Sequence, residues 1–159
     1  MPYQNILAAF DGSALSVKAL EKAIKFAQDH AARLEVIHVC HIPVPVFGGP
    51  MYAAPFNEDQ DYLLAAQGMM DEAKRLTSEL PNVKVSLKQG QPAVAILEYA
   101  EESGSDLIIM GSRGLGGLRE FVLGSVSHHV VQHSKVPVLI VKYSRFNAPL
   151  RCFFYLHKA

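Results

Sequence analysis

The most informative stretch of this 159-residue sequence is Leu107-Ile108-Ile109-Met110, which continues directly as Gly111-Ser112-Arg113-Gly114-Leu115-Gly116-Gly117. Four consecutive apolar residues are typical of a central parallel strand, which is covered on both faces. A glycine-rich loop therefore leaves the end of a buried strand. Farther on, Gly124-Ser125-Val126-Ser127 predicts the start of a helix whose first backbone N–H groups point back toward this loop. Such an arrangement is suited to holding an anion.

The spacing of the glycines excludes two better-known phosphate-binding loops. A Walker A loop needs Lys followed by Ser or Thr after its last glycine, and no such pair closes this loop or any other in the sequence. The dinucleotide fingerprint Gly-x-Gly-x-x-Gly also fails, because the sixth position counted from Gly114 is Arg119. What the sequence shows is Gly111-x2-Gly114-x9-Gly124-Ser125.

This pattern resembles the nucleotide-binding motif of the universal stress protein family. The resemblance extends beyond the motif. The stretch from Asn5 to Ser13 is similar to the first strand of that family, and the stretch from Val136 to Val141 is similar to its last strand. The resemblance covers roughly residues 3 to 142. We therefore predict a nucleotide-binding domain over residues 1–142 and a C-terminal tail over residues 143–159. The tail is aromatic, and it is either a partner-binding segment or an addition foreign to the domain.

Length and composition narrow the class of protein. A chain of 159 residues with 50% hydrophobic content is large enough for one domain with its own core. Lys plus Arg (15) balances Asp plus Glu (15), so no overall field attracts nucleic acid or an anionic membrane. No stretch reaches the roughly 18 apolar residues of a membrane span. Two cysteines make no disulfide framework, and we expect a cytoplasmic protein.

Periodicity predicts five strands and four helices that alternate along the chain. The predicted strands lie near residues 6–10, 34–39, 83–88, 107–110 and 137–141. The third carries lysines on one side, which suits an outer strand with one side in water. Alternation of strands with helices implies right-handed parallel crossovers. Residues 40–56 are rich in proline and glycine, and they predict a long loop beside the ligand crevice or a disordered excursion.

The predicted fold class is α/β, a single doubly wound open parallel sheet of five strands with helices on both faces. The family resemblance implies the strand order 3-2-1-4-5. Ligands of such sheets bind beyond the carboxyl ends of the strands, where the strand order reverses. The reversal falls between the first and fourth strands, so Asp11 and Gly111 should face one crevice.

We expect this crevice to bind ATP together with Mg²⁺. Phosphates would rest on the backbone N–H groups of Gly114, Gly124, Ser125 and Val126, and the hydroxyls of Ser125 and Ser127 would add donors. Arg113 supplies a positive charge. Asp11 is placed to accept from ribose hydroxyls or to help hold a cation, although Asp11-Gly12-Ser13 could equally form only a turn and a helix cap.

By the resemblance, Ala9, Val39 and Met110 would line an adenine pocket, whereas core packing alone would explain the same residues. His129 and His133 have the spacing of a metal-binding pair, but no third ligand is evident. No nucleophile elbow Gly-x-Ser-x-Gly occurs.

The function we predict is an ATP-binding, nucleotide-responsive stress factor. The resemblance implies a homodimer, and an apolar last strand, Val138 to Val141, at the edge of the sheet would form its interface. Two alternatives remain: a slow ATPase or nucleotidyl-handling enzyme of the adenine nucleotide alpha-hydrolase-like group, and a nucleotide-free interaction module.

Overall fold

The computed structural model describes residues 3–40, 58–114, 123–142 and 151–155. The elements follow in the order β1 (Asn5–Ala9), α1 (Ala14–His30), β2 (Arg33–Cys40), α2 (Glu58–Leu76), β3 (Lys84–Gln89), α3 (Pro92–Glu102), β4 (Leu107–Gly111), α4 (Ser125–His133), β5 (Val138–Lys142) and β6 (Arg151–Tyr155). No helix in these ranges is long and apolar enough to cross a membrane.

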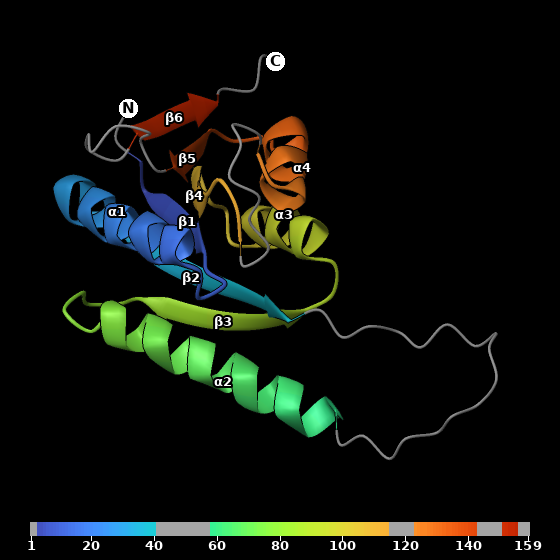
Figure 1. Cartoon of the computed structure of the whole chain (residues 1–159). Helices are drawn as coiled ribbons and strands as arrows, with labels where there is room; N and C mark the ends of the chain where they lie inside the picture. The colour runs from blue at the N-terminus through green and yellow to red at the C-terminus, as the bar shows by residue number, and fades with distance from the viewer. Residues whose placement is uncertain (1–2, 41–57, 115–122, 143–150, 156–159) are drawn as a thin grey trace.

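The strands form one sheet in the order β3-β2-β1-β4-β5-β6 (Figure 1). The first five pair in parallel, which confirms the predicted fold class and the order 3-2-1-4-5. β1 pairs with β2 on one side and with β4 on the other, so the strand order reverses between β1 and β4. The carboxyl ends of β1 and β4 therefore bound the crevice expected for a ligand.

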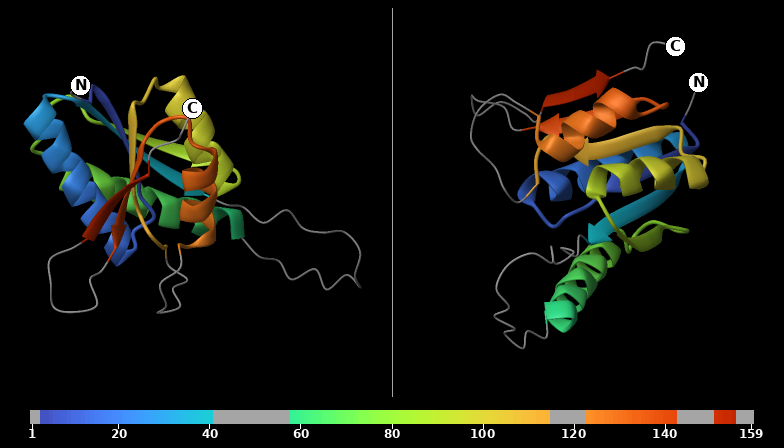
Figure 2. Two further views of the ribbon diagram at one scale, coloured as in Figure 1. Left: turned by 90° about the horizontal axis from the view of Figure 1, so that it is seen from above. Right: turned by 90° about the vertical axis from the view of Figure 1, so that its right-hand side faces the viewer.

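The sheet separates two layers of helices (Figure 2). On one face, α1 and α2 pack over a core that includes Leu20, Leu34 and Ile109. On the other face, α3 and α4 pack over a core that includes Ile96 and Ile108. Because β4 faces both layers, all five of its residues are buried, as the uninterrupted apolar run predicted.

The prediction of five strands is wrong, because the chain adds a sixth. β6 pairs antiparallel with β5, with Ile140 opposite Phe153. Phe154 also reaches across to Phe26 of α1, with their ring centroids 6.2 Å apart. β5 is therefore an interior strand, and the open edge that we expected there lies at β6.

β3 is the other edge strand, as predicted, but its two sides differ from the expectation. The side bearing Ser86 is not simply wet, because Ser86 Oγ lies 2.8 Å from the Tyr99 hydroxyl of α3. Leu87, expected to point inward, is 40% exposed. Alternation therefore separated the two sides of β3, but it did not show how far each side is buried.

Candidate functional site

The turn after β1 holds Asp11 at the carboxyl end of the sheet. Gly12 has a φ of +76°, which favours glycine because it has no Cβ. Asp11 Oδ1 accepts a hydrogen bond of 3.0 Å from the Ser13 N–H. Ser13 Oγ in turn caps α1 by accepting from the Ser16 N–H at 3.2 Å. Ser13 is therefore the predicted N-cap of α1, and the turn leaves the Asp11 Oδ2 atom facing the loop after β4.

Gly114 brings this turn together with the loop after β4. A Cβ on Gly114 would stand under 3.0 Å from Asp11 Oδ2, closer than real Cβ atoms approach their neighbours. Gly111 is also confined, since its Cβ would lie 3.0 Å from Leu15 Cβ and 3.2 Å from the Arg113 carbonyl oxygen. Two motif glycines therefore let segments 100 residues apart in sequence approach each other at the crevice.

Ser112 connects the two ends of the glycine-rich loop, of which residues 115–122 lie outside the described ranges. The Ser112 carbonyl accepts from the Gly124 N–H at 2.8 Å and from Ser127 Oγ at 2.7 Å. The Ser112 N–H donates to the carbonyl of Val141 at 2.8 Å, which anchors the loop on β5. In this structure the Gly124 N–H and the Ser127 hydroxyl, both predicted to face phosphate, instead hold the loop, and Ser127 is only 2% exposed.

The start of α4 keeps the remaining anion-binding groups. Gly124 is the N-cap with extended backbone (φ −64°, ψ 163°), and no side chain caps the helix. The first-turn N–H groups of Ser125 and Val126 lack partners within the helix, and the helix dipole places partial positive charge there. Arg113 runs beside this helix start, with its Cγ 3.7 Å from the Cβ position of Gly124. These groups can together hold a negatively charged ligand.

The three residues expected at an adenine pocket share one face of the sheet. Ala9, Val39 and Met110 all join the apolar cluster beneath α3 and α4, and they come from the adjacent strands β1, β2 and β4. Met110 is 5% exposed, while Ala9 and Val39 are partly buried. The structure therefore brings the three together near the strand ends, and Met110 also serves as core.

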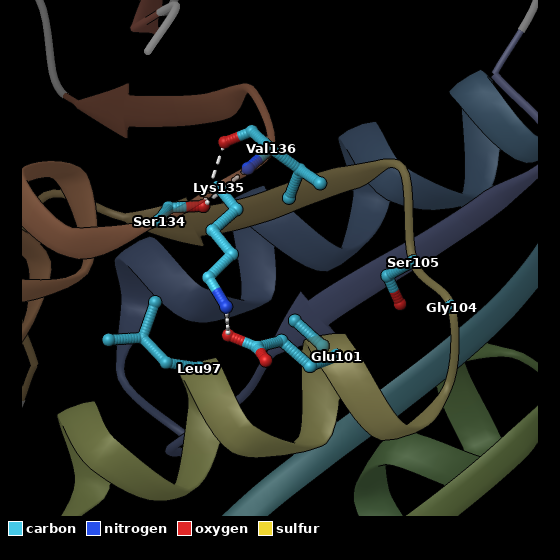
Figure 3. A pocket seen from close by; sticks show the side chains of 8 residues that line it. Leu97, Glu101, Gly104, Ser105, Ser134, Lys135 and Val136 are labelled. Carbon is cyan, nitrogen blue, oxygen red and sulfur yellow. Dashed lines mark hydrogen bonds and ion pairs between the residues drawn. The ribbon is translucent and has the colours of Figure 1, made fainter. Parts of the chain in front are cut away.

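A hollow lies between α3 and the segments that precede β4 and β5 (Figure 3). Its volume is about 310 Å³, and its lining residues precede β4 and β5 or end α3. Lys135 and Glu101 form an ion pair of 2.9 Å across it, with side chains 74% and 58% exposed. Because this hollow lies at the amino ends of the strands, it is separate from the crevice.

The model of the Usp, universal stress protein, family matches residues 2–142. The chain belongs to the universal stress protein family. It is 36% identical over 147 residues to Universal stress protein YxiE of Bacillus subtilis, which covers 88% of this chain and 99% of that protein. It is 41% identical over 142 residues to a Thermus aquaticus universal stress protein, with 88% and 99% covered.

Solved structures agree with this universal stress protein fold. Universal stress protein UspA from Lactobacillus plantarum superposes with a TM-score of 0.68 at 25% identity, covering 89% of this chain and 99% of that one. A universal stress protein in complex with cAMP superposes with a TM-score of 0.64 at 27% identity, covering 91% and 100%.

Sequence reasoning missed two residues of this universal stress protein that support the crevice. Met69 of α2 lies against Gly12, since its Sδ and Cε occupy the space that a Gly12 Cβ would need. His38 Nδ1 lies 2.8 Å from the Phe10 carbonyl, and because a carbonyl only accepts, this nitrogen donates. Met69 recurs with Ala66 and Ala73 at helical spacing, which indicates a core position, but no local signal indicates which turn it contacts.

The histidine pair on α4 is engaged within the helix. The rings of His129 and His133 stack with centroids 4.1 Å apart, and His133 Nδ1 lies 2.9 Å from the His129 carbonyl. Within the described ranges, no group of three or more His, Cys, Asp or Glu side chains is arranged to hold a metal ion.

Proposed function

We propose that this universal stress protein binds an adenine nucleotide, ATP with Mg²⁺, in the crevice between β1 and β4. The observation that carries the proposal is the approach of Gly114 to Asp11, because it joins a carboxylate to a glycine-rich loop at the point where the strand order reverses. The similar universal stress protein in complex with cAMP, at 27% identity, supports an adenine-containing ligand.

Each group in the crevice has a chemical role in this proposal. The first-turn N–H groups of Ser125 and Val126 bind phosphate oxygens, and Arg113 adds positive charge. Asp11 Oδ2 accepts from a ribose hydroxyl or helps hold the cation that accompanies the phosphates. Ala9, Val39 and Met110 provide the apolar surface for the base. Asp11 would therefore mark where the ribose lies, and the N–H groups at the start of α4 would mark where the phosphates lie.

The protein acts as a nucleotide-responsive stress factor and hydrolyses ATP slowly at most. Fast phosphoryl transfer needs a positioned water, a residue that orients it and charge stabilisation beyond that needed for binding. Asp11 is already bonded to the Ser13 N–H, and the motif carries Arg113 but no Walker-type lysine. Equal stabilisation of bound ATP and of the transition state gives no acceleration.

Titration calorimetry with Mg·ATP tests the proposal. Wild-type protein, stripped of any nucleotide that co-purifies, is expected to bind ATP at one site per chain, and Asp11→Ala is expected to bind more weakly. Lys74→Gln, an exposed change on α2 away from the crevice, is the matched control. Wild-type protein that binds no adenine nucleotide would support the nucleotide-free interaction module instead.

We also propose that the protein is a homodimer through its last strand. In this structure the outermost strand at that edge is β6, which leaves one side of its backbone unpaired within the described ranges and exposes Phe154 by 48%. Sedimentation of a chain ending at Lys142 tests this interface, because a monomer would show that β6 carries the contact even though the edge of β5 is then open. A dimer that persists would place the contact elsewhere.

A further inference from the structure

The edge strand β3 and the helix α3 enclose a groove. It lies at the edge of the sheet opposite β6. Its volume is about 390 Å³. Its lining joins two ammonium groups, hydroxyls and one aromatic ring, contributed by Lys84, Ser86, Leu87, Lys88, Tyr99, Glu102 and Ser103. Nothing in the proposed nucleotide site uses these residues.

The two lysines are held over one ring. Lys84 Nζ lies 5.5 Å and Lys88 Nζ lies 5.2 Å from the ring centroid of Tyr99. The ring is fixed in turn, because the Tyr99 hydroxyl donates to Glu35 Oε2 at 2.5 Å and lies 2.8 Å from Ser86 Oγ. Both positive charges are therefore placed by buried structure, whereas lysines that merely keep an edge soluble need no such support.

The groove presents a net positive charge. Glu35 is only 4% exposed, and it is shared among Arg33, Lys84 and the Tyr99 hydroxyl. Tyr99 and Glu35 raise the pKa of Lys84, so this ammonium stays charged at physiological pH. Lys88 pairs at 3.1 Å with Glu102, whose side chain is 62% exposed. Such an exposed pair contributes little to stability, so an incoming carboxylate can replace Glu102.

The backbone of β3 adds a second recognition element. The Gly90 N–H donates to the Cys40 carbonyl, and Gln89 is the register partner of Cys40. In a parallel pair of strands, this hydrogen bond and this register mean that the even-numbered residues of β3 direct their main-chain groups toward β2. The N–H and C=O groups of Val85 and Leu87 therefore point away from the sheet, and no other described strand pairs with them. Leu87 itself lines the groove.

We propose that this groove is a docking site for a short, extended, acidic peptide segment of a partner protein. The segment pairs its main chain with the outward groups of Val85 and Leu87, and alternate carboxylates meet Lys84 and Lys88. A nucleic acid would use the two charges but not the open main chain, which favours a peptide. The inference is independent of nucleotide binding.

Fluorescence anisotropy with a labelled, blocked hexapeptide of alternating valine and glutamate tests the proposal. We expect saturable binding to the full-length protein that weakens with added salt. The double variant Lys84→Gln, Lys88→Gln should weaken it by about tenfold or more, since two charge pairs are lost. Lys74→Gln, which removes an exposed lysine from α2, should leave the affinity unchanged. Absent binding, or equal affinity in the double variant, would overturn the proposal.

Two further measurements separate the elements of the site. A hexapeptide methylated at alternate backbone nitrogens retains its charge but cannot pair as a strand, so it should bind at least about tenfold more weakly. Amide chemical shifts of the unmutated protein should move at Val85 and Leu87 when the hexapeptide is added, a readout that needs no variant to fold. Unmoved shifts there, or tighter binding of a single-stranded oligonucleotide through the same lysines, would refute a peptide-docking edge.

Discussion

Replacing Gly114 with alanine should weaken nucleotide binding by moving Asp11. The added Cβ would lie inside the 3.0 Å limit from Asp11 Oδ2, so the carboxylate has to leave its position. The Gly114 backbone itself accepts alanine, because its φ lies outside the left-handed region. The perturbation therefore acts on the neighbouring carboxylate and not on the conformation of the loop.

The magnitude follows from the contact that Asp11 would lose. A hydrogen bond to a charged group contributes about 1.5–3 kcal/mol, so its loss should raise the Kd for ATP roughly 10- to 150-fold. Calorimetry measures this change, and circular dichroism checks the fold. Gly124→Ala is the matched control for a motif glycine, because its Cβ would meet its nearest neighbour, the Ser112 carbonyl oxygen, at an ordinary 3.4 Å.

A double-mutant cycle identifies the cause. If Gly114→Ala acts by displacing Asp11, it should have little further effect in protein that already carries Asp11→Ala. The same loss in both backgrounds would refute the displacement, and wild-type affinity in Gly114→Ala would refute the placement of Asp11 at the ligand.

Three further predictions follow from the same contacts. Gly124→Val should abolish ATP binding without unfolding the protein, because the larger side chain crowds Arg113 where phosphate approaches the helix start; calorimetry and circular dichroism would measure both effects. ATP turnover with Mg²⁺ should fall below the usual enzyme range of about 1 to 1000 per second, and a faster rate lost in Arg113→Ala would favour an enzyme. Tyr99→Phe should lower the unfolding free energy by about 1–3 kcal/mol in urea, because buried Glu35 loses its donor; an unchanged midpoint would contradict this.

The sequence was sufficient to predict the parallel part of the sheet. Leu107 to Met110 showed a strand buried on both faces, and Ser13 showed a helix cap, because both signals are local in the chain. The strand order came from the family resemblance. β6, which pairs with β5, was not predicted, and its Phe154 also contacts Phe26, which is far away in sequence. Local propensity contains no information about such a contact.

In the candidate site, too, the sequence predicted some features and left others to contacts between distant residues. Glycine spacing indicated the loop, and the strand order implied by the family resemblance placed Asp11 beside it. Neither could show which donors the loop uses to hold itself together. From the sequence alone, the Ser127 hydroxyl and the Gly124 N–H are both reasonable phosphate ligands. In the structure both donate to the Ser112 carbonyl instead. Closing the loop requires those donors, since a buried carbonyl without partners is costly. In the proposed site, a phosphate would therefore meet the next N–H groups, those of Ser125 and Val126, which the helix geometry leaves without internal partners.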